Sequence, residues 1–126
     1  MESLRNLALL VGRVFVAGVF IYDAMLLIRY QEANIAFMEG FGVPGIMLWP
    51  TAAFQFLGGI LIILGFWTRL VALAFAGFCV LTALTFHRDF GDTNEIIQFG
   101  KDFAVAGGYL FLFAEGPGNW SADARR

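Results

Sequence analysis

This chain is short of charged residues, of cysteine and of histidine. Only 14% of its 126 residues are Asp, Glu, Lys or Arg, whereas a soluble domain carries about 25%. The basic residues form no long run, so the sequence offers no surface of the kind that binds nucleic acid. Cys79 is the only cysteine, which excludes an internal disulfide, a CxxC redox pair and a cysteine-rich metal site. A lone buried thiol most often packs as a small hydrophobic residue.

Apolar residues take the place of the missing charges. Hydrophobic residues make up 60% of the chain, Phe alone occurs 15 times, and the mean hydropathy is +0.76. These values indicate a surface that faces lipid, and the length predicts a single integral membrane domain over residues 1–126. The apolar run near the N-terminus continues past Arg13 to Ile28, which is longer than the core of a cleavable signal peptide. We therefore expect an uncleaved first membrane span.

Four segments are long and apolar enough to cross a membrane. A membrane helix needs about 20 residues to cross about 30 Å of hydrocarbon, and open strands cannot satisfy their backbone groups there. The predicted spans are residues 7–28, 45–65 (or starting at Pro50), 69–86 and 96–114. The fourth is the weakest, because Lys101 and Asp102 lie in its first turns. The predicted fold is an all-α membrane four-helix bundle that runs up-down-up-down.

The connections between the spans differ in length. Residues 65–69 form a tight turn, which predicts that spans two and three make an antiparallel hairpin. Residues 29–45 are long enough for a short helix lying in the membrane interface. The basic residues predict the orientation, because cytoplasmic loops carry an excess of Lys and Arg. The side of the two termini and the short turn has five (Arg5, Arg13, Arg69, Arg125 and Arg126), and the other side has three (Arg29, Arg88 and Lys101). Both termini are therefore expected in the cytoplasm, with Arg13 snorkelling towards that interface.

Asp23 lies inside the first span, where an ionisable group is costly and is a functional hypothesis by default. Arg13 is about 15 Å away along the helix and cannot pair with it. The partner of Asp23 must therefore come from another helix, and three candidates lie at matching depth: His87, Arg88 and Lys101. A structural ion pair and a functional carboxylate remain equally open. Asp102 points about 100° away from Lys101 and is expected to bind a different neighbour.

His87 is the sole histidine, so this chain alone cannot build a multi-histidine metal site or a bis-histidine haem site. It can carry a proton or donate a hydrogen bond to a quinone carbonyl. The structural alternative is an amphipathic ring at the interface beside Arg88.

Gln55 lies on a helix face of small residues, with Ala52, Gly58 and Gly59. Such a face lets another backbone approach closely, and an amide on it can bond across helices for about 1 kcal/mol. From the residues alone, Gln55 is most simply a packing contact.

The chain resembles the DoxX-like family of small four-span membrane proteins over nearly its full length. The resemblance rests on the order and spacing of LLVGRVFVAGVFIYDA, FGVPG, FQFLGGILIILGFWTRLVALAF, TFHRDFGD and FGKDFAVAGGYLFLFAEGPGNWSAD. It implies a bacterial inner (plasma) membrane location and a link to quinone-dependent sulfur oxidation, or to oxidoreductase assemblies of thiol and superoxide defence. Members commonly carry a glutamate where this chain has Gln55, and often a lysine where it has Asp23.

The resemblance implies a subunit or accessory of a quinone-linked membrane oxidoreductase complex. Its outer-leaflet pocket would be lined by Asp23, Gln55, His87, Arg88 and Lys101. Because glutamine has no titratable proton, Asp23 and His87 are the candidate catalytic groups, with quinone as the cofactor and no metal. Besides membrane lipid, the expected partner is a larger redox protein or a second copy of the chain. The alternative is a non-catalytic assembly or structural subunit, and whether the chain is itself an enzyme stays open.

Overall fold

The computed structural model describes residues 1–86, 91 and 93–125, and all regular structure in these residues is helical. The elements in chain order are α1 (Glu2–Arg29), α2 (Gln31–Gly40), η1 (Gly45–Met47), α3 (Leu48–Leu64), α4 (Thr68–Phe86), α5 (Thr93–Glu115) and η2 (Asp123–Arg125). Four of them, α1, α3, α4 and α5, supply the helical segments that are long and apolar enough to cross a membrane. With the short α2 between the first two, they confirm the predicted all-α membrane bundle.

Proline and glycine mark the two ends of α3. Pro50 lies in its first turn, where the missing backbone N–H removes no intrahelical bond. The helix ends at Gly65, whose φ of 71° is readily adopted only by glycine. The N–H of Phe66 donates to the carbonyl of Leu61 at 2.9 Å, which is the long bond of a Schellman motif. The chain therefore reverses sharply into α4.

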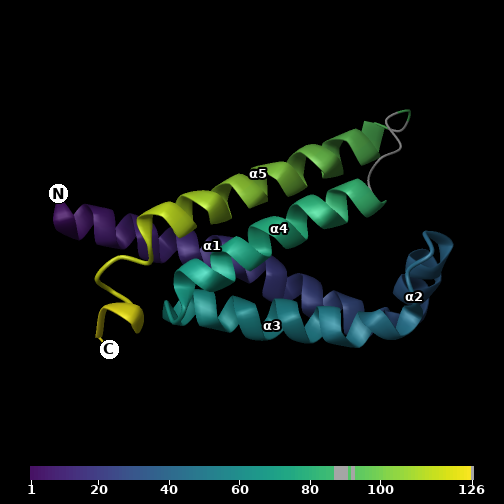
Figure 1. The fold of residues 1–126 in the computed structure, drawn as a ribbon, viewed down its shortest axis with the longest axis horizontal. Coiled ribbons are helices and arrows are strands. Elements are labelled where there is room, and N and C mark those ends of the chain that lie inside the picture. The colour runs from purple at the N-terminus through teal and green to yellow at the C-terminus, as the bar shows by residue number, and fades with distance from the viewer. Residues whose placement is uncertain (87–90, 92, 126) are drawn as a thin grey trace.

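The four long helices pack as two close pairs, α1 with α3 and α4 with α5 (Figure 1). Gly59 shows how near α1 and α3 come, because a Cβ there would lie 2.6 Å from Cγ1 of Ile21 and 3.3 Å from the carbonyl oxygen of Ala17. The prediction that spans two and three form the hairpin is only half right. The tight turn does join α3 to α4, but the close partner of α3 is α1.

A layer of aromatic rings separates the two pairs. The ring centroid of Phe75 lies 4.5 Å from that of Phe20, 5.0 Å from Phe54 and 5.2 Å from Tyr109. Phe75 and Tyr109 are fully buried in this core. Aromatic rings fill the space between the two pairs, whereas small residues lie at the contact within a pair. For this reason α3 and α4 do not approach each other as closely as α1 and α3 do.

Both chain ends lie at one end of the bundle, which we call the terminal end, and α2 lies at the other, the α2 end (Figure 1). The tail that follows α5 returns to the end of α3. The N–H of Ala122 donates to the carbonyl of Leu64 at 2.9 Å, and that of Asp123 to the carbonyl of Gly65 at 2.8 Å. In Figure 1 the two helix pairs separate towards the α2 end.

Arg13 lies beneath this tail and is only 1% exposed. Its Nη1 donates to the carbonyls of Ile62 and Ile63 at 3.3 and 3.1 Å, and its Nη2 donates to the carbonyl of Trp120 at 2.6 Å. The expectation that Arg13 snorkels to the membrane interface is therefore wrong. The last carbonyls of a helix have no intrahelical donor and carry its negative dipole end. The guanidinium of Arg13 donates to two of these carbonyls, on Ile62 and Ile63, and holds the tail at the same time.

Candidate functional site

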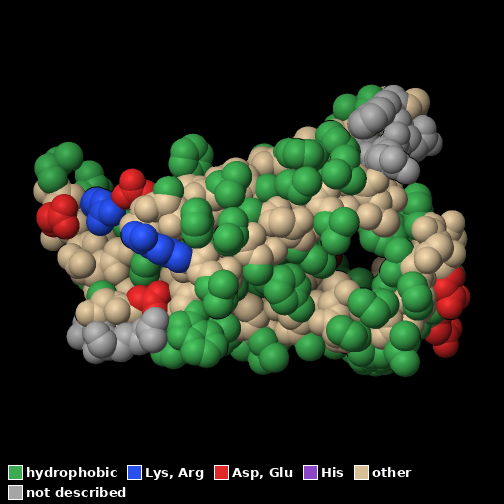
Figure 2. Space-filling model, viewed as in Figure 1, with side chains coloured by type: hydrophobic (Ala, Val, Ile, Leu, Met, Phe, Trp, Pro, Cys, Tyr) green, Lys and Arg blue, Asp and Glu red, His purple; other side chains and the backbone are tan. Residues whose placement is uncertain are grey.

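A cleft of about 450 Å³ lies between the two helix pairs towards the α2 end. Figure 2 shows the surface hollowed between the pairs on this side. The aromatic rings of Phe20 and Phe78, together with aliphatic side chains, form part of its walls. Polar side chains from all four long helices also line it: Asp23, Gln55, Thr82, Gln98, Lys101 and Asp102. A mostly apolar cavity with a few convergent polar groups is the usual form of a ligand site.

Asp23 and Gln55 form a hydrogen-bonded pair at this cleft. The Nε2 of Gln55 on α3 donates to Oδ2 of Asp23 on α1 at 2.8 Å. Gln55 is 2% exposed, whereas the Asp23 side chain is open to the cleft. The close approach of α1 and α3 at Gly59, one turn along the helix from Gln55, brings the two side chains within reach. Among the described residues, the hydrogen-bond partner of Asp23 is therefore an amide, and a cation from residues 87–88 stays a prediction.

The hydrogen bond to Asp23 also fixes which way the Gln55 amide points. A carboxylate accepts but does not donate, so Nε2 must face Asp23 and Oε1 must face away. Oε1 is buried and has no hydrogen-bond partner among the described residues. A buried carbonyl oxygen without a donor costs free energy, so Oε1 is an acceptor that the described residues leave unsatisfied.

Helices α4 and α5 supply the opposite wall. Lys101 and Asp102 both line the cleft, Lys101 exposed and Asp102 half-buried. The two side chains border the same cavity, and the prediction that Asp102 binds a different neighbour from Lys101 stays a prediction. Of the five predicted pocket residues, the structure brings Asp23, Gln55 and Lys101 to one cleft. His87 and Arg88 lie outside the described residues.

Three further polar residues at the cleft were missed from the sequence: Thr82, Gln98 and Asp102. Helical spacing could have identified two of them. Gln98 lies three residues before Lys101 and four before Asp102, so the three share one side of α5. Thr82 lies three residues after the buried Cys79, and both line the cleft. A threonine within an apolar helix carries too little signal on its own.

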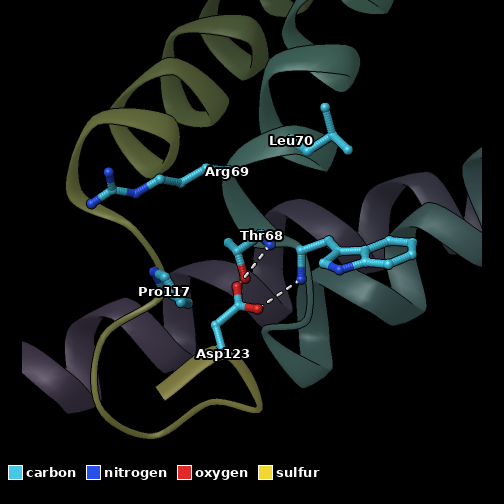
Figure 3. A pocket seen from close by; sticks show the side chains of 6 residues that line it. Thr68, Arg69, Leu70, Pro117 and Asp123 are labelled. Atoms are coloured by element: carbon cyan, nitrogen blue, oxygen red, sulfur yellow. Dashed lines mark hydrogen bonds between the residues drawn. The ribbon is translucent and has the colours of Figure 1, made fainter. Parts of the chain in front are cut away.

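A second cavity, of about 430 Å³, lies at the terminal end, and we call it the terminal pocket. Figure 3 shows its lining from the start of α4 and from the tail (Trp67, Thr68, Arg69, Leu70, Pro117 and Asp123). Asp123 accepts from the backbone N–H of Trp67 at 2.8 Å and of Thr68 at 2.9 Å. These are N-cap bonds, supplied to α4 by a residue far along the chain.

Comparison with known proteins shows relatives of the whole chain. The DoxX family model matches residues 8–88. Inner membrane protein YqjF of Escherichia coli (strain K12) is 37% identical over 123 residues, which cover 98% of this chain and 95% of that protein. Inner membrane protein YphA of the same organism is 31% identical over 128 residues, 96% of this chain and 91% of its own length. No solved structure matches.

Proposed function

This chain belongs to the DoxX family and is an inner membrane protein like its relatives, and we propose that it is an accessory subunit of a quinone-linked membrane oxidoreductase complex. The observation that carries the proposal is the cleft between the helix pairs, which Asp23, Gln55 and Lys101 line together with further polar side chains. Polar groups at such depth are costly and mark substrate or proton pathways in membrane proteins.

The cleft has the size and chemistry to hold a quinone headgroup. Its volume of about 450 Å³ lies within the range of roughly 300–1,000 Å³ of small-molecule sites. Phe20 and Phe78 contribute aromatic walls, and the ammonium of Lys101 and the hydroxyl of Thr82 offer donors for carbonyl oxygens. A bound quinone would supply a two-electron, two-proton redox couple.

The residues of the chain would then bind, orient and exchange protons. Lys101 holds a carbonyl oxygen, and the unpartnered Oε1 of Gln55 accepts a hydrogen bond from the hydroxyl of a reduced ring. Asp23 is the group that takes or gives a proton, because its carboxylate is open to the cleft. Gln55 has no proton to exchange and instead holds the Asp23 carboxylate in place. His87 remains a second candidate proton carrier, and Arg88 a second cation for the same pocket.

Electrons would enter from a larger partner protein, because reduction of a quinone needs an electron donor, which we assign to another protein.

Both termini are proposed to lie in the cytoplasm, which places the cleft nearer the outer leaflet. Arg5 and Arg69 at the terminal end carry charges that favour this orientation. A reporter domain fused after residue 126, active only in the cytoplasm, tests it. Activity of a periplasm-specific reporter at that position would reverse the orientation.

The second candidate function is that of a non-catalytic assembly subunit. It is favoured by two glycines of α1, Gly12 and Gly18, beside which a Cβ would meet nothing within 4 Å. Uncovered glycines on a membrane helix allow a partner helix to approach closely. On this view the chain docks through α1 and needs no cofactor of its own.

Gentle detergent purification distinguishes the two functions. Partner proteins are identified, bound quinone is extracted and quantified, and quinone-dependent turnover of the complex is measured with the native chain and with Asp23→Asn. The redox role predicts bound quinone and reduced turnover with an intact complex. Normal turnover with Asp23→Asn, together with loss of the complex when Gly12 or Gly18 is replaced by Leu, would establish the assembly role instead.

A further inference from the structure

The terminal pocket continues into an apolar groove between α3 and α4. The groove has a volume of about 370 Å³, and its walls include Ala53, Leu57, Leu61 and Ala74. Leu70 lines both the groove and the terminal pocket, so the two cavities adjoin. The terminal pocket lies where the helices end and has three polar lining residues, Thr68, Arg69 and Asp123, whereas the groove is apolar and runs along the membrane-spanning part. A molecule with a polar head and a hydrocarbon chain would match these two cavities, with the head in the terminal pocket and the chain in the groove.

Arg69 supplies an available positive charge at the polar end. Its side chain is exposed and makes no hydrogen bond or ion pair within the part of the chain that the structure describes. Two other arginines at this end, Arg5 and Arg13, are engaged. Arg5 pairs with Glu115 at 2.7 Å, and Arg13 is bound to backbone carbonyls. Figure 3 shows the guanidinium of Arg69 extending from α4 on the side of the pocket where Pro117 lies.

Thr68 supplies a second polar group at the same place. Its side chain is fully buried, it lines the terminal pocket, and its Oγ1 has no hydrogen-bond partner among the described residues. A hydroxyl can donate to a phosphate oxygen, as a guanidinium can. The backbone N–H of Thr68 is already bound to Asp123, so the start of α4 is not itself the anion site. Among the described residues that line the pocket, Arg69 and the Thr68 hydroxyl are two donors that remain for a phosphate.

We propose that the terminal pocket and the adjoining groove together bind one zwitterionic phospholipid. Its phosphate lies on Arg69 and Thr68, and one acyl chain occupies the groove between α3 and α4. The carboxylate of Asp123 lines the same pocket and opposes a second negative charge. A headgroup of zero net charge therefore binds better than an anionic one. Trp67, half exposed beside the pocket, has the amphipathic ring typical of the headgroup level.

Native mass spectrometry of the full chain tests this proposal. The purified protein is exchanged into mixed micelles that contain phosphatidylethanolamine, phosphatidylcholine or phosphatidylglycerol with the same acyl chains. We expect one retained lipid per chain, with either zwitterionic lipid retained better than phosphatidylglycerol. Arg69→Gln should lower the affinity by roughly tenfold or more, as the loss of a charge-assisted hydrogen bond predicts. Arg69→Lys should retain most of the binding.

Two matched pairs of variants separate a built site from the general lipid shell. Ala74→Phe fills the groove from an exposed position, whereas Leu73→Phe adds a ring on a neighbouring face that does not line it. Arg5→Gln removes a different arginine at the same end. Loss of the retained lipid in Ala74→Phe but in neither control supports the site, even if Arg69→Gln does not fold. Equal retention in all variants, stronger binding of phosphatidylglycerol, or a second copy of the chain covering Arg69 would overturn the proposal.

Discussion

The side-chain amide of Gln55 donates a 2.8 Å hydrogen bond to the carboxylate of Asp23 across the interface of α1 and α3. The two residues lie in different helices, and the backbones approach closely nearby because Gly59 has no side chain. The amide holds the carboxylate at the cleft and leaves its own Oε1 facing away. Packing and site chemistry therefore depend on the same contact.

A double-mutant cycle on this pair should show energetic coupling. Gln55→Leu leaves the carboxylate without its donor, and Asp23→Ala leaves the buried amide without its acceptor. Each single change should cost about 1–3 kcal/mol, and the double variant less than the sum by about 1 kcal/mol. Thermal unfolding in detergent measures the three values. Additive costs would mean that the hydrogen bond contributes nothing measurable.

The close contact of α1 with α3 makes a separate prediction at the glycines. Gly59→Ala pushes a methyl group towards Ile21 and the backbone of Ala17, so it should destabilise by about 1–3 kcal/mol. Gly77→Ala is the matched control, because a Cβ there meets nothing within 4 Å. It should be neutral or slightly stabilising. Equal unfolding temperatures for the two variants would contradict the proximity of the helices.

The number and class of the helices could be predicted from the sequence, because each span must supply its own backbone hydrogen bonds and enough apolar length. The pairing could not. Small residues occur on several helices, and the short turn at residues 65–69 predicts an antiparallel hairpin of α3 and α4 but not which helix packs closest to α3. Aromatic rings such as those of Phe54 and Phe75 separate α3 from α4. In the sequence these residues cannot be distinguished from the other apolar residues of the spans.

The cleft was partly predictable for a related reason. Depth along a helix brings Asp23 and Lys101 to one level, and that argument requires no knowledge of packing. The partner of Asp23 depends on which helix lies beside α1, so Gln55 appeared only as a packing residue. Arg13 was misjudged because depth alone suggested an interfacial anchor. The tail that covers it returns from more than a hundred residues away in the sequence.

Arg13 should be more important for stability than an arginine at a lipid interface. Arg13→Met removes donors from the carbonyls of Ile62, Ile63 and Trp120 and should cost at least about 2 kcal/mol. The freed tail should also become sensitive to added protease, which mass spectrometry detects. Arg5→Gln breaks an exposed ion pair at the same end and should change little. A native-like unfolding temperature and an intact tail in Arg13→Met would contradict the buried role.

Loss of the N-cap that the tail supplies to α4 should lower the stability less than loss of Arg13, and the size of the loss should depend on which residue replaces Asp123. Asp123→Ala removes the acceptor from the N–H groups of Trp67 and Thr68 and should destabilise by about 1 kcal/mol. Asp123→Asn keeps an oxygen at the same place and should retain most of the stability, since both residues are good N-caps. Thermal unfolding of the two variants checks the order. Equal losses would show that the charge of Asp123, and not its cap bonds, is what stabilises the bundle.

Filling the cleft should remove bound quinone without unfolding the protein. Thr82→Trp places a large ring in the cavity, and Leu81→Trp places the same ring on the next residue, which is 65% exposed and does not line it. If the cleft holds the headgroup, the first variant should retain several-fold less quinone per chain than the second. Both should unfold within a few degrees of the native chain, because Thr82 lies at the edge of open space.

Quinone extracted from the purified variants and quantified by absorbance gives the ratio. Equal retention by both variants would assign the quinone to a surface other than the cleft. Loss of a partner protein in Leu81→Trp alone would instead favour docking through the lipid-facing side of α4.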